Sequence, residues 1–72
     1  MVTIGELRAL TSRAISNDQY YVQINGRPIV HVHIQGSTLW LNTGPGFPVP
    51  ARIFQLLLSG WAADNLVSVL EA

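Results

Sequence analysis

Two histidines separated by one residue are the clearest candidates for chemistry in this sequence of 72 residues. In an extended strand, His31 and His33 point to the same side at a spacing of about 7 Å, which allows both imidazoles to approach one metal ion. A zinc site takes at least three protein ligands, and the chain contains no cysteine. Its aspartates and glutamates fall at predicted caps, turns and exposed helix positions. We therefore expect two half-exposed sheet histidines, with no metal and no cofactor.

Hydroxyl groups are the remaining candidate nucleophiles. The serines and threonines form no Gly-x-Ser-x-Gly elbow, and no evident base with an orienting acid accompanies them. The segment Gly44-Pro45-Gly46 lacks the lysine and the serine or threonine that follow the glycines of a phosphate-binding loop. We therefore predict that the protein is not an enzyme.

Charge and hydropathy limit the kinds of partner. Four arginines balance four acidic residues, so the net charge is zero and the chain lacks the clustered positive field of a nucleic-acid-binding protein. Charged residues make up 11% of the chain, less than half of the roughly 25% that is typical of soluble proteins. The 49% of hydrophobic residues excludes intrinsic disorder and leaves apolar surface to be covered. Because so short a chain buries only about 60% of its unfolded surface, we expect a protein partner and a homodimer.

Nothing in the sequence indicates a membrane protein. Its most apolar stretch, residues 53–70, is interrupted by polar residues, whereas a bilayer span needs about 20 mostly apolar residues. The N-terminus lacks the basic, apolar and small-residue regions of a signal peptide. We therefore expect a cytoplasmic protein.

The periodicity predicts one small α+β domain over residues 1–72, in the order α-β-β-β-α-α. Thr3 and Glu6 form a capping box that begins an N-terminal helix, and a polar run at residues 16–18 ends it. Residues 2–4 could also pair as an edge strand in a dimer. Alternation with a period of two then predicts a three-stranded antiparallel meander, with strands at residues 20–24, 28–35 and 38–42.

The turns of the meander set its register. A two-residue loop at Gly36-Ser37 pairs Ile34 with Leu39, which places alternate apolar residues on one face. At Asn25-Gly26 we expect a three-residue loop with a bulge, because a two-residue loop would turn Val22 away from that face. The opposite face is then expected to carry Tyr21, Gln23, Ile29, His31, His33, Gln35, Thr38, Trp40 and Asn42.

The C-terminal half is expected to be helical after a stiff connector. Prolines at positions 45, 48 and 50 fit neither a helix nor an inner strand. A helix is predicted over about residues 51–59, with Ile53, Leu56 and Leu57 on one stripe. A last helix is predicted from residue 61 or 62 to the C-terminus, so that two helices close the chain.

The ring-bearing sheet face and the surplus apolar helix surface are the candidate contact sites. Interfaces are enriched in Tyr and Trp and depleted in Lys, Glu and Asp, which matches this composition. Residues 54–61 carry more apolar side chains than one sheet face can bury. The rings could also stack unpaired bases, but the basic groove that supports such binding is missing. The predicted protein-binding residues are Tyr21, His31, His33, Trp40, Phe54, Leu58 and Trp61.

Two segments of the N-terminal half carry a family resemblance. Residues 2–8 read Val-Thr-Ile-Gly-Glu-Leu-Arg, and residues 21–30 read Tyr-Val-Gln-Ile-Asn-Gly-Arg-Pro-Ile-Val. Together they resemble the Phd/YefM-type antitoxins, which open with a short strand and a Ser-Glu-Ala-Arg-like helix start, followed by a hairpin with an Asn-Gly-Lys-Pro-Val-like turn. The resemblance covers about residues 1–34, and the C-terminal half does not match. It implies a dimer in which Arg8, Arg13 and Arg27 approach DNA.

Two functions follow as hypotheses. The first is a non-catalytic interaction module that binds and regulates or inhibits a protein partner through shape and apolar patches. Its size and lack of motifs are typical of proteins that phages and mobile elements encode. The second, which the resemblance implies, is an antitoxin-like dimer that binds DNA as an autorepressor.

Overall fold

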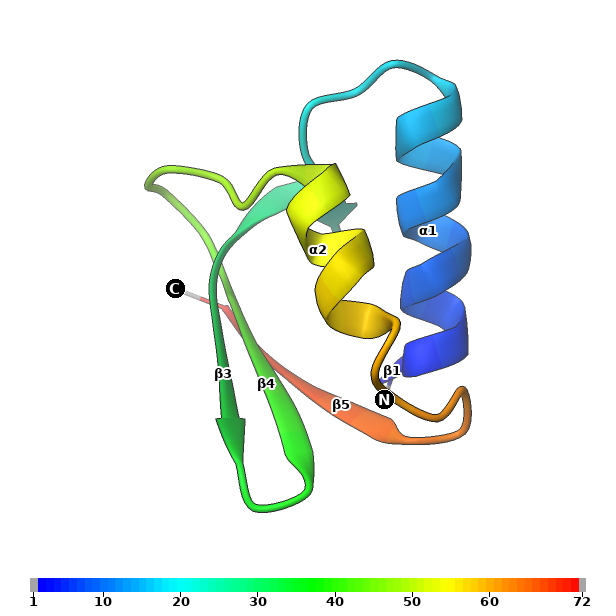
Figure 1. Ribbon diagram of the computed structural model, residues 1–72. Helices are drawn as coiled ribbons and strands as arrows, with labels where there is room; N and C mark the ends of the chain where they lie inside the picture. Colours follow the sequence, from blue (N-terminus) through cyan, green and yellow to red (C-terminus); the bar gives the residue numbers. More distant parts are fainter. Residues whose placement is uncertain (1, 72) are drawn as a thin grey trace.

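Within residues 2–71, which the computed structural model describes, two helices cover one face of a curled five-stranded sheet (Figure 1). The strands lie in the order β1-β5-β4-β3-β2. The predicted three-stranded meander with two C-terminal helices is therefore wrong as a description of the whole fold. The elements are β1 (Val2–Thr3), α1 (Ile4–Ser16), β2 (Gln23–Ile24), β3 (Arg27–Gln35), β4 (Thr38–Thr43), α2 (Ala51–Leu58) and β5 (Leu66–Glu71).

Helix α1 begins at the predicted cap. The Thr3 hydroxyl accepts a hydrogen bond from the Glu6 backbone N–H at 3.2 Å and donates one to the Glu6 carboxylate at 3.2 Å. At the other end, Asp18 takes a positive φ of 60°, and the Gln19 N–H donates to the Ala14 carbonyl at 2.8 Å. This wrap of the chain satisfies a carbonyl of the last turn and directs the backbone toward the sheet.

The β3–β4 hairpin has the predicted register. Ile34 lies opposite Leu39 and Val32 opposite Leu41, on either side of the two-residue Gly36-Ser37 turn. Leu39 and Leu41 are completely buried beneath the helices. Ile34 lies near the tip of the hairpin and remains 59% exposed.

The turn between β2 and β3 differs from the expectation. Its loop has two residues, Asn25 and Gly26, whose φ angles of 55° and 78° are those that a type I′ turn requires. The bulge lies further along, between Ile29 and His31 of β3. Its extra residue puts Ile29 on the core face, where it is 1% exposed. We expected Ile29 on the opposite face, because the sequence analysis placed the extra residue in the turn at Asn25-Gly26 rather than after Ile29.

The last strand replaces a predicted helix. Residues 66–71 form β5, which pairs in parallel with β4 so that Leu41 lies beside Val69. β4, α2 and β5 therefore form a strand-helix-strand crossover, the usual connection between parallel strands. In the run Leu-Val-Ser-Val-Leu, both valines fall on one face of an extended strand, and β-branched residues favour strands. The final residue of the predicted helix, Ala72, lies outside the described residues.

The N-terminal strand finds its partner within the chain. Val2 lies opposite Val67 and Thr3 opposite Leu66, so that β1 is antiparallel to β5. We expected residues 2–4 to pair across a dimer, since the prediction of a C-terminal helix left them without an internal partner. β5 supplies that partner.

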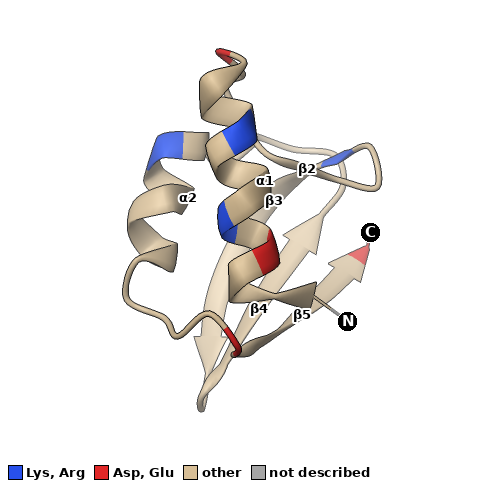
Figure 2. Cartoon of the chain, turned by 90° about the vertical axis from the view of Figure 1, so that its right-hand side faces the viewer, with Lys and Arg blue, Asp and Glu red and all other residues tan. Residues whose placement is uncertain are grey.

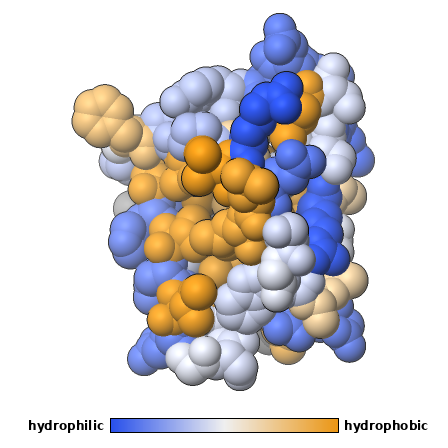
Figure 3. Space-filling model, in the orientation of Figure 1, coloured by the Kyte–Doolittle hydropathy of each residue, from blue (hydrophilic) through white to orange (hydrophobic). Residues whose placement is uncertain are grey.

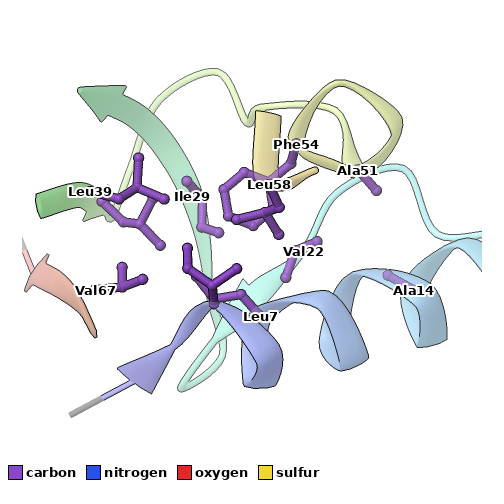
Figure 4. Close-up of a cluster of buried hydrophobic side chains, with 11 residues drawn as sticks. Leu7, Ala14, Val22, Ile29, Leu39, Ala51, Phe54, Leu58 and Val67 are labelled. Carbon is purple, nitrogen blue, oxygen red and sulfur yellow. The ribbon is translucent and has the colours of Figure 1, made fainter. Parts of the chain in front are cut away.

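The core lies between the helices and the inner face of the sheet (Figure 4). On α2 the buried stripe is displaced from the predicted one: Phe54 and Leu58 point inward, whereas Ile53 and Leu56 are 56% and 71% exposed. The helix therefore turns two large apolar side chains to the outside. The buried apolar residues are Ile4, Leu7, Ala14, Val22, Ile29, Leu39, Leu41, Ala51, Phe54, Leu58 and Val67.

Two substitutions in β5 distinguish a strand from a helix. We expect Val67→Ala to lower the free energy of unfolding by about 2 kcal/mol, because it removes buried methyl groups and leaves a cavity. Leu66→Ala should lower the free energy of unfolding by less than about 0.5 kcal/mol, since Leu66 is 54% exposed in the strand. Urea unfolding followed by circular dichroism measures both. A larger loss for Leu66→Ala than for Val67→Ala would contradict the strand.

Candidate protein-binding surface

Among residues 2–71, the outer face of the sheet, opposite the helices, carries no Asp, Glu, Lys or Arg side chain. Trp40 is its central residue, with His33 opposite on β3 and Ser68 beside it on β5. β5 adds Leu66 and Leu70, which are 54% and 45% exposed. The uncovered face of a sheet ordinarily carries polar residues that face water, so this mixture of rings and leucines is unusual. The outer face consists of His31, His33, Gln35, Thr38, Trp40, Asn42, Leu66, Ser68 and Leu70.

Three rings form a row on the outer face. His33 stacks on Trp40 with 6.2 Å between ring centroids and 12° between planes. The His31 ring follows at a centroid distance of 5.5 Å from His33. Because the stacked pair is also a cross-strand pair, the backbone ladder holds both rings in place. The row is a continuous line of aromatic rings, in which His31 is tilted by 36° to His33.

Two polar atoms on the outer face lack partners. His33 Nδ1 and Asn42 Oδ1 are buried and have no hydrogen-bond partner among the described residues. An unpaired buried polar group costs free energy, so each such atom in a folded protein needs an explanation. Because both atoms are buried, the cost belongs to the fold, and a partner on the surface does not reach them.

An open hollow adjoins the row of rings. Its volume is about 450 Å³, and it is lined by Val2, Trp40, Val67, Ser68 and Val69. The Trp40 indole forms its aromatic wall, whereas Val67 is buried with its side chain in the core. The ring row and the hollow together give the outer face both a line of rings and a recess.

The structure brings together three of the predicted protein-binding residues, His31, His33 and Trp40. It also adds Leu66 and Leu70 to them, which the prediction of a C-terminal helix placed elsewhere. The signal that could have found these leucines is the alternation in residues 66–70.

The other predicted contact residues lie apart from the outer face. Phe54 and Leu58 belong to the core, at 1% and 0% exposure, and cannot contact a partner. Trp61 is half-buried against the core in the connection that follows α2. Tyr21 precedes β2, where its backbone pairs with Pro50.

A second apolar surface extends from α2 to β3 (Figure 3). Its exposed members are Ile34 of β3 and Ile53 of α2, at 59% and 56% exposure. Val32, Val49 and Leu57 are partly buried alongside the core.

The arginines are dispersed rather than clustered (Figure 2). A guanidinium nitrogen of Arg8 donates to the backbone carbonyl of Leu58 at 2.9 Å and to that of Trp61. The resemblance implied that Arg8 approaches DNA, whereas here it caps the C-terminal end of α2 from the neighbouring helix. Arg13 and Arg27 are exposed, on α1 and at the beginning of β3 respectively.

No family model, curated protein or solved structure matches this chain. The antitoxin resemblance therefore stays a prediction. Within residues 2–71, no three His, Cys, Asp or Glu side chains come together in a group that could hold a metal ion. No helix in this range is long and apolar enough to cross a membrane. A functional proposal must therefore come from the surfaces.

The cap on α2 predicts unequal roles for two arginines. We expect Arg8→Met to lower the free energy of unfolding by about 2 kcal/mol, because it leaves the Leu58 and Trp61 carbonyls without their charged donor. The exposed Arg13→Met should change it by less than about 0.5 kcal/mol. Urea unfolding compares the two variants, and equal effects would contradict the capping role of Arg8.

Proposed function

We propose that this protein is a non-catalytic interaction module that binds a protein partner through the outer face of its sheet. The observation that carries the proposal is a sheet face without a helix or a charged residue, on which His33 and Trp40 stack beside a hollow. Cores of protein interfaces are depleted in charged residues and enriched in tryptophan. The outer face has this composition, whereas a solvated face would not need it.

Trp40 is the expected anchor of the complex. It belongs both to the stacked pair and to the lining of the hollow, so a partner side chain in the hollow would contact the indole ring. Buried aromatic residues at the centre of an interface contribute most of its binding free energy.

Binding of this protein would itself regulate the partner. A module without catalytic groups acts by covering a surface or by holding one conformation of what it binds. Nucleic acid is a weaker candidate for this face, because stacking of bases without cations to neutralise the phosphates gives little affinity. The antitoxin-like alternative also has less support, since Arg8 is engaged with the Leu58 and Trp61 carbonyls.

A capture experiment tests the outer face. The immobilised chain is incubated with extract of the cells that produce it, as wild type, as Leu66→Asp and as the matched control Ser12→Asp on the exposed side of α1. We expect a protein that wild type and Ser12→Asp retain and Leu66→Asp loses, because a carboxylate on an apolar contact face is desolvated without a partner. Mass spectrometry of the retained proteins reads out the difference.

The captured protein then allows a quantitative measurement. Trp40→Ala should weaken its affinity by about 2 kcal/mol, or roughly 30-fold, in calorimetric titration. Circular dichroism of each variant verifies that the fold is intact. Retention of the same proteins by all three baits would contradict binding through the outer face.

A further inference from the structure

The edge of β3 is open along most of its length. On the side away from β4, β2 pairs only with Arg27 and Pro28, at the beginning of the strand. The Val49 N–H then donates to the Ile29 carbonyl at 2.7 Å. Beside residues 31–35 no further strand of the described chain follows. In an antiparallel ladder every second residue turns its N–H and C=O away from the paired strand, so this stretch presents unpaired backbone groups.

This open edge lacks the usual protection. Proteins prevent edge strands from pairing with other chains by charges, prolines, bulges or short strands. Residues 31–35 read His-Val-His-Ile-Gln, without a proline, Asp, Glu, Lys or Arg, and the bulge precedes them. The opposite edge of the sheet has a shorter open stretch, because β1 covers Leu66 and Val67 and the charged Glu71 ends β5, which leaves residues 68–70 between them.

We propose that a second copy of this chain occupies the edge, with the two β3 strands antiparallel about a two-fold axis at His33. His33 then lies opposite its own mate, Val32 opposite Ile34 of the second copy, and His31 opposite Gln35. Because the strand alternates, polar side chains meet on the outer face and branched apolar side chains meet on the helix side. A strand of this pattern is complementary to itself.

The position of the axis follows from the hairpin. In a two-residue hairpin the residues that flank the loop bond to each other, so Gln35 bonds to Thr38 and the alternate residues Val32 and Ile34 turn their backbone groups outward. An axis at His33 aligns these outward groups with those of the second copy. A two-fold axis at Val32 would instead place Val30, in the bulge, opposite Ile34 of the second copy. The side of β3 next to Val30 is already occupied by Gly46 and Val49 of the same chain.

Two neighbouring features fit this occupant. Apolar surface lies beside β3 (Figure 3), so the second copy would also cover Ile34, which is 59% exposed on this strand. Phe47 is 95% exposed on the proline-rich loop beside the start of the open stretch. Antiparallel pairing brings the Gly36-Ser37 turn of the second copy to this loop, where Phe47 would contact it. Because the net charge of the chain is zero, two copies do not repel each other through their net charge.

Single cysteines test the register, because the chain contains none of its own. The two position-33 Cα atoms would lie about 4.5 Å apart, within reach of a disulfide. We expect His33→Cys to form a covalent dimer on mild oxidation, seen on a non-reducing gel. Gln35→Cys is the matched control on the same face of the strand; its mate lies about 13 Å away, so it should stay monomeric. Cross-linking of Gln35→Cys instead of His33→Cys, or of neither, would overturn the proposal.

Molar mass in solution tests the interface independently. Light scattering over a dilution series should show a dimer for wild type and at least a tenfold weaker dimer for Ile34→Lys, whose cation faces an apolar surface. Leu66→Lys, of similar exposure but on β5, is the matched control and should stay dimeric. A wild-type monomer at every concentration, or an undiminished dimer in Ile34→Lys, would overturn self-pairing. Ile34 does not belong to the outer face. A failure of self-pairing in this experiment would therefore leave the proposed partner binding through Leu66 and Trp40 untouched, and the capture experiment tests that binding separately.

Discussion

β4 is the strand on which the rest of the structure depends, because it is hydrogen-bonded along both of its sides. β3 pairs with it in antiparallel and β5 in parallel, and these strands in turn hold β2 and β1. Its inward residues Leu39, Leu41 and Thr43 are completely buried. Its outward residue Trp40 forms the centre of the outer face. The ladder that orders the core therefore orders the candidate contact surface as well, and the indole ring needs no loop to position it.

Local signals in the sequence were enough for α1, the β3–β4 hairpin and the row of rings. The cap at Thr3, the Gly36-Ser37 turn and strict alternation each act over a few residues, so the pattern carries them. The position of the bulge was harder to predict. The alternation requires a shift of the register by one residue between Val22 and Val32, but it does not indicate at which residue the shift occurs. Ile29 and Val30 are both apolar, and only the packing decides which of them is buried.

Features that depend on distant segments were not predictable in the same way. Residues 66–71 fit a helical stripe as well as a strand, and the open edge of β4 that selects the strand belongs to another part of the chain. Leu66 and Leu70 were missing from the predicted site for this reason. The role of Arg8 could not be predicted for the same reason. Helical periodicity indicates the side of α1 on which Arg8 lies, but it does not indicate that the carbonyls of Leu58 and Trp61 lie next to it.

The pairing of β1 with β5 has a consequence for synthesis on the ribosome. β1 and α1 are made first, yet the strand that joins them to the sheet is made after every other described element. Until β5 emerges, β4 has one unpaired side and the inner leucines lack part of their cover. Contacts so distant in sequence form late and slow the folding of a domain. The complete sheet therefore forms only after residue 71 has been synthesised.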